Sequence, residues 1–406
     1  MVCEAMQKKE KPVVVSVEQA LSMSYATLRF VHLGWRVIRV EATQKGERPG
    51  DPNRYVGRPV AHGGRNSYFV APNVGKEAVA LNLKDPRGQR LLKDILAGLD
   101  ADVFCTNTLP SRHRDLGIDA STLRGTRPEL IWCCISALGL AHPNVPGYDP
   151  VLQAFSGYMD LTGESDGPPL LCGPPITDLR AGDEAFSQIL LAMYERQSSG
   201  QGKTIDVSMA QAATSWLLTS LPMLDMGSPP SEVRRSGNQH RQFIPTNAYK
   251  TKDGFIYLAV GSDAQWERLT RSALFSSLAK TELSSNEGRR KQKDWLHERM
   301  GEIISSETTE TVAQLLKNAG IPASPITSIE QVAELEAVAD KLLRTTSPDG
   351  KVIRLPPPAV KTEWLDRQAQ QLPFAPAYGE HTRAVLTEVG IEEQQIAALT
   401  AEGVVA

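Results

Sequence analysis

The first half of the chain alternates short β-branched runs with segments of helical periodicity. This alternation predicts an α/β fold with a largely parallel sheet, because parallel strands need a long crossover, usually a helix, between them. Residues 12–17 predict a strand, residues 24–34 a helix closed by its glycine, and residues 35–41 a second strand. Further strands are predicted at residues 78–83, 101–107, 130–136 and 204–209, and helices at 86–98, from Gly182 onward and at 210–224.

Two polar passages rich in Pro, Gly and Arg divide the chain. We expect residues 1–226 to form the N-terminal part of a large domain and residues 227–247 to be a linker. Residues 248–327 then predict a smaller α+β domain that begins with a hairpin around Lys252-Asp253-Gly254. Residues 328–377 are expected to be a return linker, and residues 378–406 to complete the large domain.

The charge of the chain is nearly balanced, with 44 basic and 47 acidic residues and a net charge of −3. Such a balance gives no reason to expect nucleic acid or an anionic membrane as a partner. The longest apolar run, residues 131–141, is too short to span a bilayer, and residues 1–12 are charged where a signal peptide needs an apolar core. We therefore expect a soluble, cytoplasmic protein whose five cysteines are free thiols.

Several common catalytic motifs are missing from the sequence. The GKT at residues 202–204 lacks the earlier glycine of a phosphate-binding loop, no G-x-G-x-x-G follows the first strand, and no serine lies in G-x-S-x-G. The seven histidines show no paired metal-ligand spacing, so we expect no metal site.

A carboxylate remains as a candidate catalytic group. Asp178 follows a Gly-Pro-Pro turn just before the helix predicted from Gly182, where free backbone N–H groups favour an anion. A helix cap or a solvated loop acid is the alternative interpretation.

Several motifs, in order along almost the whole chain, resemble the class III coenzyme A transferases, the family that includes formyl-CoA transferase, carnitine CoA-transferase and the α-methylacyl-CoA racemases. The resemblance is carried by LGWRVIRVEATQKGERPGDPNRY, GKEAVALNLKDPRGQRLL, ADVFCTNTLP, YKTKDGFIYLAV and YGEHTRAVLTEVGI. Its most extended part is residues 146–209, with ITDLRAGDEAF at its centre. We identify the chain from these motifs as a member of this family.

The resemblance implies a Rossmann-like large domain with a parallel sheet built from both chain ends, a small α+β domain, and an interlocked dimer. The dimer would be a homodimer or a heteromer with a related subunit. The resemblance also implies that Asp178 is the nucleophile, with acyl-aspartyl anhydride and aspartyl-CoA thioester intermediates. Acyl-CoA and a small carboxylic acid would be the substrates, and no tightly bound cofactor is expected.

Coenzyme A binding is implied at positions that match the family motifs, although Ser24, Ala42 and Asp115 depart from the usual residues there. Arg112 and Arg114 are candidates to supply the missing positive charge, with a solvated basic turn as the alternative. The full set of candidates for coenzyme A binding is Ala20, Leu21, Ser22, Lys76, Asn107, Pro110, Arg112, Arg114 and Ser136.

The opening residues 15–28 resemble the sub-group that moves CoA among dicarboxylates, and residues 148–186 resemble its benzylsuccinate-acting members, which have two related subunits and act in anaerobic toluene degradation. Succinyl-CoA is the expected donor. Cationic candidates for the acceptor's second carboxylate are Arg180, Arg234, Arg235, His240 and Arg241, and Tyr148 is a further candidate for substrate binding.

Two other functions stay open from the sequence. The racemase branch uses a histidine in a G-H-D context, whereas this chain has Gly147-Tyr148-Asp149, and tyrosine is a poor general base near neutral pH. A non-catalytic partner subunit would keep the fold without the chemistry, and the presence of Asp178 argues against it.

Overall fold

The computed structural model describes residues 11–43 and 48–406, so Cys3 and the charged start of the chain lie outside the described residues. The chain folds into two compact units. The larger comprises the residues up to Ser156 together with Gly173–Leu218 and Glu336–Ala406, and the smaller comprises Gly157–Cys172 and Thr219–Leu335. Each unit is described by itself below.

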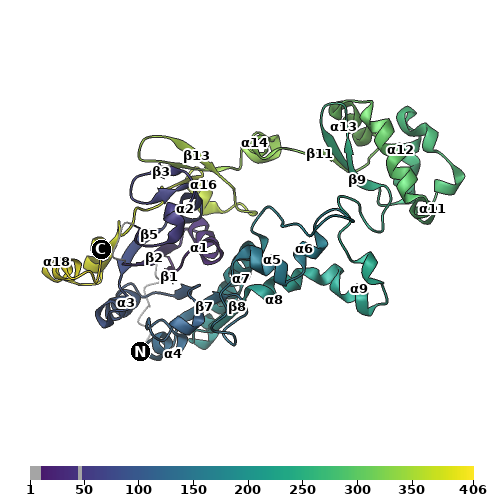
Figure 1. Ribbon diagram of the computed structural model, residues 1–406. Helices are drawn as coiled ribbons and strands as arrows, with labels where there is room; N and C mark the ends of the chain where they lie inside the picture. Colours follow the sequence, from purple (N-terminus) through teal and green to yellow (C-terminus); the bar gives the residue numbers. More distant parts are fainter. Residues whose placement is uncertain (1–10, 44–47) are drawn as a thin grey trace, which may run out of the picture. The chain divides into compact units, whose positions relative to one another are not determined.

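A six-stranded parallel sheet forms the centre of the larger unit (Figure 1). Its strand order is β5-β2-β1-β6-β7-β8, and the register pairs Val15 of β1 with Ile38 of β2 and with Phe104 of β6. The predicted strands are therefore present, within a few residues of their expected bounds. The strands are β1 (Val13–Val17), β2 (Arg36–Ala42), β5 (Glu77–Leu81), β6 (Val103–Thr106), β7 (Ile131–Ser136) and β8 (Thr204–Ser208).

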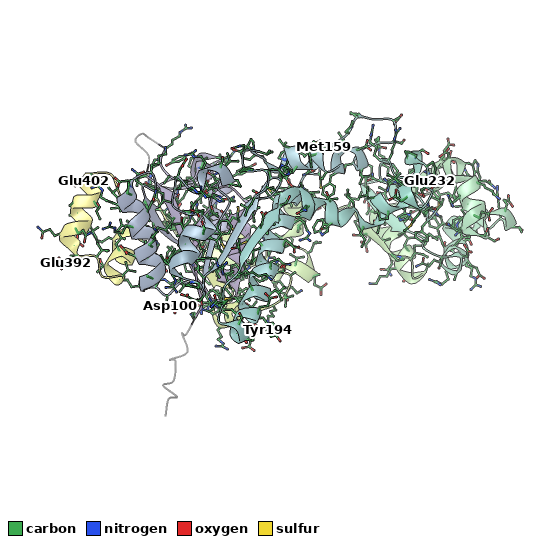
Figure 2. The ribbon with its side chains drawn as sticks, turned by 90° about the horizontal axis from the view of Figure 1, so that it is seen from below. Asp100, Met159, Tyr194, Glu232, Glu392 and Glu402 are labelled. Atoms are coloured by element: carbon green, nitrogen blue, oxygen red, sulfur yellow. The ribbon has the colours of Figure 1, made fainter. Side chains whose placement is uncertain are left out.

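Both faces of this sheet are buried, which explains why its strands are apolar runs rather than alternating ones. On one face, Val14 packs in a core with α1 (Ser22–His32) and α7 (Ile176–Ser199). On the other face, Val13 and Val15 pack in a core with α3 (Pro86–Gly98) and with the C-terminal helices α17 (Thr382–Glu388) and α18 (Glu393–Ala401). In Figure 2, Glu392 and Glu402 mark the two ends of α18.

The prediction that both chain ends supply the parallel sheet is wrong. All six strands come from residues 13–208, whereas the C-terminal residues add α17, α18 and one antiparallel bridge between Leu81 and Val405. The unit as a whole is still built from both ends, because Val385, Leu386 and Val405 belong to the core on the α3 face. Figure 1 shows the yellow C-terminal helices beside β5 and α3.

The passage 328–377, expected as a linker, carries regular structure. Its first helix, α14 (Ile329–Val332), belongs to the smaller unit. In the larger unit, the passage forms α15 (Glu336–Ala339), α16 (Glu363–Arg367) and a three-stranded sheet of β12 (Leu343–Thr346), β13 (Val352–Leu355) and β14 (Gln371–Leu372). From this passage, Leu343, Leu355, Leu365 and Leu372 are buried in the core on the α1 face. The remaining short elements of the larger unit are β3 (Pro59–Ala61), β4 (Arg65–Asn66), α2 (Ser67–Asn73), α4 (Ala120–Thr126), α5 (Asp149–Phe155), α8 (Met209–Ser215) and the 3-10 turns η1 (Pro52–Tyr55) and η2 (Pro110–Arg112).

The prediction of one buried helix over residues 210–224 is also wrong. This stretch is broken into α8, a 3-10 turn η3 (Trp216–Thr219) and α9 (Leu221–Asp225), because Leu217 leaves helical geometry and Pro222 cannot continue an upstream helix. Large apolar side chains of this stretch are exposed: Trp216, Leu218, Leu221, Leu224 and Met226.

The smaller unit begins its sheet with the predicted hairpin. Strands β9 (Thr246–Lys250) and β10 (Phe255–Ala259) pair antiparallel, and the Thr251 N–H donates to Gly254 O across the turn. A third strand, β11 (Ala323–Pro325), pairs with β10. One core joins this sheet to its helices, with Trp266, Leu296 and Leu316 among its members. The other elements of the unit are α6 (Tyr158–Leu161), α10 (Asp263–Thr270), α11 (Asn286–Lys291), α12 (Lys293–Ser305), α13 (Thr309–Asn318), η4 (Pro230–Glu232), η5 (Ala273–Leu278) and η6 (Thr281–Leu283).

No described helix is both long enough and apolar enough to cross a membrane. Among residues 11–43 and 48–406, no group of three or more His, Cys, Asp or Glu side chains is arranged to hold a metal ion.

Candidate active site

Asp178 lies in the first turn of α7, not before it. The helix begins at Ile176 rather than near Gly182, with Pro175 as its N-cap residue. The preceding Pro174 and Pro175 set this start, because a proline fixes φ and disfavours helical geometry in the residue before it. The carboxylate of Asp178 is therefore held by a 24-residue helix instead of a mobile loop.

The free N–H groups at this helix end are bound by another carboxylate. Asp149, the first residue of α5, accepts hydrogen bonds on Oδ1 from Thr177 N and from Thr177 Oγ1, both at 2.7 Å, and from Asp178 N at 3.4 Å. Gln153 Nε2 donates to Asp149 Oδ2 at 2.7 Å. Asp149 is only 6% exposed. Through these hydrogen bonds it caps α7 from the neighbouring helix α5. The expectation that helix N–H groups stabilise the Asp178 anion is thus wrong.

Asp178 consequently has the properties of a partly desolvated carboxylate. Burial, and after it the negative charge of Asp149, raise the pKa of Asp178 to about 7. Near neutral pH, a substantial fraction of the group is ionised and poorly solvated. A carboxylate in this state is a stronger nucleophile than one in water.

Gly182, one turn beyond Asp178, lets α7 approach the N-terminus of α1. A Cβ atom at Gly182 would lie 2.7 Å from Tyr25 Cδ1 and 2.8 Å from Ser22 O, closer than real Cβ atoms come to their neighbours. Glycine is required here by close approach rather than by its backbone conformation. The packing brings the first turn of α1 against the second turn of α7.

A cavity of about 400 Å³ opens at the carboxyl ends of β1, β2, β5 and β6. The strand order changes direction between β1 and β6, and crevices of this kind are the usual ligand sites of open parallel sheets. The lining residues are Val17, Glu18, Gln19, Val40, Glu41, Ala42, Thr43, Gly50, Asp51, Pro52, Leu81, Asn82, Leu83, Lys84, Thr108, Leu109, Arg112 and Leu116.

Several candidates for coenzyme A binding meet beside this cavity. Asn107 holds the loop after β1, because its side chain accepts from Gln19 N at 3.0 Å and donates to Gln19 O at 2.8 Å and to Ser22 Oγ at 3.3 Å. Ala20, in this loop, has a positive φ of 55°. Leu21 is the N-cap residue of α1 and Ser22 its first residue.

The turn after β6 supplies a second group of candidates. Pro110 and Arg112 form η2, and Arg112 lines the cavity with an exposed side chain. Arg114 is exposed as well. The intervening His113 is buried, where its Nε2 lies 2.8 Å from Thr108 O. Ser136, at the end of β7, is also buried, and its Oγ has no hydrogen-bond partner among the described residues.

Lys76 occupies a different environment from the one expected. It is 3% exposed, and its ammonium donates to Glu18 Oε1 at 2.7 Å, Ser24 O at 2.8 Å and Asn73 Oδ1 at 3.2 Å. An ammonium has three donors, and all three are engaged. Burial lowers the pKa of Lys76 to about 8. The side chain therefore holds the structure beneath the cavity and presents no free charge to a phosphate.

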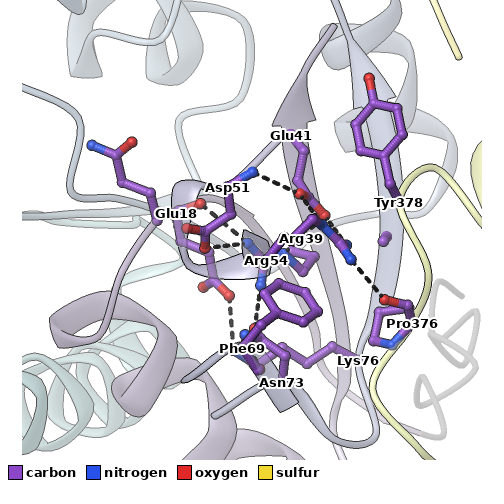
Figure 3. Close-up of polar contacts among 12 residues, drawn as sticks. Glu18, Arg39, Glu41, Asp51, Arg54, Phe69, Asn73, Lys76, Pro376 and Tyr378 are labelled. Atoms are coloured by element: carbon purple, nitrogen blue, oxygen red, sulfur yellow. Dashed lines mark hydrogen bonds and ion pairs between the residues drawn. The ribbon is translucent and has the colours of Figure 1, made fainter. Parts of the chain in front are cut away.

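Lys76 belongs to a buried ion cluster, shown in Figure 3. The cluster contains equal numbers of acids and bases, so it adds no net charge beside the cavity. Arg39 donates to Asp51 Oδ2 at 2.8 Å, and Arg54 Nε donates to Glu41 Oε2 at 2.7 Å. Asp51 also accepts from Ala20 N at 3.3 Å, which ties the cluster to the loop after β1. The cluster consists of Glu18, Arg39, Glu41, Asp51, Arg54 and Lys76.

The candidates for acceptor binding are divided between the two units, with Tyr148 and Arg180 in the larger one. Tyr148 is 70% exposed and is the N-cap residue of α5, next to Asp149. Arg180 pairs with Glu184 at 2.7 Å and lies over the Trp216 ring. It is two residues from Asp178, which places the two side chains about 200° apart around the helix. Arg180 instead lines a separate cavity of about 520 Å³ along β8.

The remaining acceptor candidates belong to the smaller unit. His240 Nδ1 accepts from Gln242 N and Phe243 N, and Arg241 Nε donates to Arg234 O at 2.9 Å. Arg235 pairs with Asp160 at 3.0 Å. These contacts shape the loop that precedes β9.

Sequence reasoning missed Asp149 and Asp51. Each is followed by a proline in the first turn of a helical segment, Asp149-Pro150 in α5 and Asp51-Pro52 at η1, which is a local signal for an acid at a helix start. The signal does not name the distant groups that these acids bind. Those partners become visible only in the folded chain.

Comparisons with known proteins show the family of the chain. The model of CoA-transferase family III matches residues 12–382. The chain is 29% identical over 411 residues to succinyl-CoA:glutarate CoA-transferase of Mus musculus, covering 99% of this chain and 91% of that protein. It is 32% identical over 394 residues to succinate–glutarate CoA-transferase of Agrobacterium fabrum, covering 93% and 94%.

The fold is shared with solved structures. A CAIB/BAIF family protein from Brucella suis superimposes with a TM-score of 0.80 at 25% sequence identity, covering 93% of this chain and 98% of that chain. Rv3272 from Mycobacterium tuberculosis superimposes with a TM-score of 0.76 at 22% identity, covering 93% and 99%.

Proposed function

The chain belongs to CoA-transferase family III, and from this premise we propose that it moves coenzyme A from succinyl-CoA to a dicarboxylic acid through Asp178. As a member of the family, the protein is an enzyme that transfers coenzyme A, and CoA thioesters are substrates rather than resident cofactors. The observation that carries the proposal is the state of Asp178, a half-buried carboxylate in the first turn of α7 with a pKa raised to about 7.

The proposed reaction exchanges one thioester for another. A carboxylate oxygen of Asp178 attacks the succinyl-CoA carbonyl, the C–S bond breaks, and the products are a succinyl-aspartyl anhydride and the CoA thiolate. The thiolate then attacks the Asp178 carbonyl, which releases succinate and leaves an aspartyl-CoA thioester. The acceptor carboxylate opens this thioester to a second anhydride, and the thiolate forms the new acyl-CoA as the Asp178 carboxylate is regenerated.

We place the nucleotide part of coenzyme A in the cavity between β1 and β6. Support comes from the position of the cavity at the point where the strand order changes direction and from the loop of Ala20, Leu21 and Ser22 beside it. Arg112 and Lys84 line this cavity and are the cations we assign to the phosphates, with Arg114 and Pro110 in the same turn. The buried Lys76 contributes through the ion cluster and not by direct contact.

We propose glutarate, or a dicarboxylate of similar length, as the acceptor. Two relatives support this choice, one from a mammal and one from a bacterium, each aligned over more than 90% of this chain. Both are named as CoA-transferases between succinate, or succinyl-CoA, and glutarate. The resemblance of residues 148–186 to benzylsuccinate-acting members makes benzylsuccinate the second acceptor to test.

The experiment is an acceptor comparison with the purified full-length chain. Succinyl-CoA is mixed with glutarate, benzylsuccinate or butyrate, and new acyl-CoA is quantified by liquid chromatography and mass spectrometry. Butyrate is the matched control, because it lacks the second carboxylate of a short dicarboxylate. We expect kcat/KM for glutarate to exceed that for butyrate at least about a hundredfold, since a site built for a carboxylate is left unpaired by its absence. Equal rates for the two acids would contradict the dicarboxylate assignment, and no transfer to any acid would contradict the proposed function.

We also propose that the enzyme works as a dimer. Each unit exposes large apolar side chains: Trp216 and Leu218 in the larger unit are 54% and 76% exposed, and Leu221, Leu224 and Met226 in the smaller unit are 41% or more exposed. Exposed apolar groups commonly mark an interface. Light scattering should give a mass near twice 44.3 kDa, and a mass of 44.3 kDa would overturn the proposal.

A further inference from the structure

Asp149 accepts the hydrogen bonds that the N-terminal end of α7 could otherwise offer to the Asp178 carboxylate. Its Oδ1 takes both donors of Thr177 and lies 3.4 Å from Asp178 N, so the positive end of α7 is already occupied by a negative charge. Both Asp149 oxygens accept hydrogen bonds, the pattern of an ionised carboxylate. The Asp178 carboxylate is therefore repelled by a neighbouring anion. It also accepts no hydrogen bond from Thr177 N or Asp178 N, because both donate to Asp149.

Other ionisable groups near α7 have partners or are neutral, so they do not offset this repulsion. The elements packed against α7 are α1, α5, α8, β7 and β8. Burial lowers the pKa of His32 on α1 to about 4 and raises the pKa of the Cys133 and Cys134 thiols on β7. The contacts of the remaining groups are Asp183 with Arg29 of α1, Glu184 with Arg180, Arg196 with Asp102, Glu195 with Lys203, Asp206 of β8 with Leu140 N, and Tyr25 of α1 with Asp183.

We propose that Asp149 is a positioning residue whose charge favours the acylated state of Asp178 over the free carboxylate. The inference rests on the proposed function, because it concerns the same covalent intermediates. Acylation converts Asp178 from an anion into an uncharged anhydride or thioester, and the repulsion between the two carboxylates disappears with it. The hydrogen bonds to Thr177 and Asp178 N simultaneously fix the helix turn that carries the reacting group.

The test uses Asp149→Asn, which keeps an oxygen acceptor for Thr177 and removes the charge. Two quantities are measured with the full-length chain. The first is the pH dependence of kcat/KM, whose acid limb in the wild type should lie near pH 7, since Asp178 must be ionised to attack. In the variant, we expect this limb to move to lower pH by roughly one unit, because a like charge has been removed.

The second quantity is the fraction of enzyme held as aspartyl-CoA thioester at pH 8 and a fixed ratio of succinyl-CoA to succinate, measured by intact mass after acid quench. We expect the equilibrium constant for thioester formation to fall about tenfold, the equivalent of one pKa unit. A role confined to capping the helix would move neither the limb nor this constant. Asp183→Asn is the matched control, an acid of the same helix whose charge is paired with Arg29, and it should leave both unchanged.

Thr177→Val separates the effect of positioning Asp178 from the effect of the Asp149 charge. It also provides a second test if Asp149→Asn does not fold. It removes one hydrogen bond to Asp149 and keeps both carboxylates, so kcat should fall about tenfold with the acid limb unmoved. An unchanged kcat in Thr177→Val, or an unmoved limb and thioester constant in a folded Asp149→Asn, would overturn the inference. A wild type that forms no thioester and transfers no CoA would instead refute the proposed function.

Discussion

Asp178→Ala is expected to lower CoA-transferase turnover at least about a thousandfold, which is about 4 kcal/mol of activation free energy. The reason is that the variant has no atom that can accept the acyl group, so both covalent intermediates are lost. The measurement is the initial rate of acyl-CoA formation from succinyl-CoA and glutarate at pH 8. The wild-type carboxylate is mostly ionised at pH 8, because this pH lies above its raised pKa of about 7.

The control for this prediction is Asp183→Asn, which removes an acid from the same helix and should keep turnover within a few-fold of wild type. Circular dichroism checks that both variants are folded. A folded Asp178→Ala protein that retains more than about one thousandth of wild-type turnover would show that the reaction does not need this carboxylate.

Arg39→Ala is expected to destabilise the larger unit by about 3–5 kcal/mol, because breaking a buried ion pair leaves uncompensated charge in the interior. The Arg39 side chain is fully buried. It donates to Asp51 and to Asn73, and its Nε lies 3.3 Å from Glu41 Oε1, an ion pair without hydrogen-bond geometry. Without it, the ion cluster keeps Glu18, Glu41 and Asp51 against two cations, Arg54 and Lys76.

Urea unfolding followed by circular dichroism measures this effect. The control is Arg367→Ala on α16 of the same unit, whose arginine is 74% exposed and pairs with Glu363 at the surface, where such pairs contribute less than about 1 kcal/mol. If Arg39→Ala unfolded at the same urea concentration as Arg367→Ala, the ion cluster would not be a main support of the larger unit.

Strand and helix positions in the larger unit could be predicted from the sequence, because each depends on a local pattern. Helix α3 matches its predicted bounds since Asp85 caps it, Pro86 begins it and Gly98 ends it. The helix predicted at 210–224 failed for the opposite reason. Its apolar residues have helical spacing, but Pro222 interrupts the helix and Trp216 and Leu218 stay exposed.

The site could be predicted only in part. Family motifs predict Asp178 as the nucleophile and Ala20 to Ser22 as candidates for coenzyme A binding. The environment of each charge could not be predicted, because it depends on residues far along the chain. Lys76 meets Glu18 from 58 positions away, and Thr177 meets Asp149 from 28 positions away. A lysine in a motif and a lysine in a buried ion pair are identical in the sequence.

The most direct test of the covalent mechanism is peptide mass spectrometry after incubation of the protein with succinyl-CoA. Trypsin cleaves after Arg180, and fragmentation of the resulting peptide distinguishes Asp178 from Asp149 and the other acids within it. The account predicts a coenzyme A adduct on Asp178 that hydroxylamine removes and that Asp178→Ala lacks. Transfer of CoA between acids with this carboxylate unmodified, or with the adduct on another residue, would contradict it.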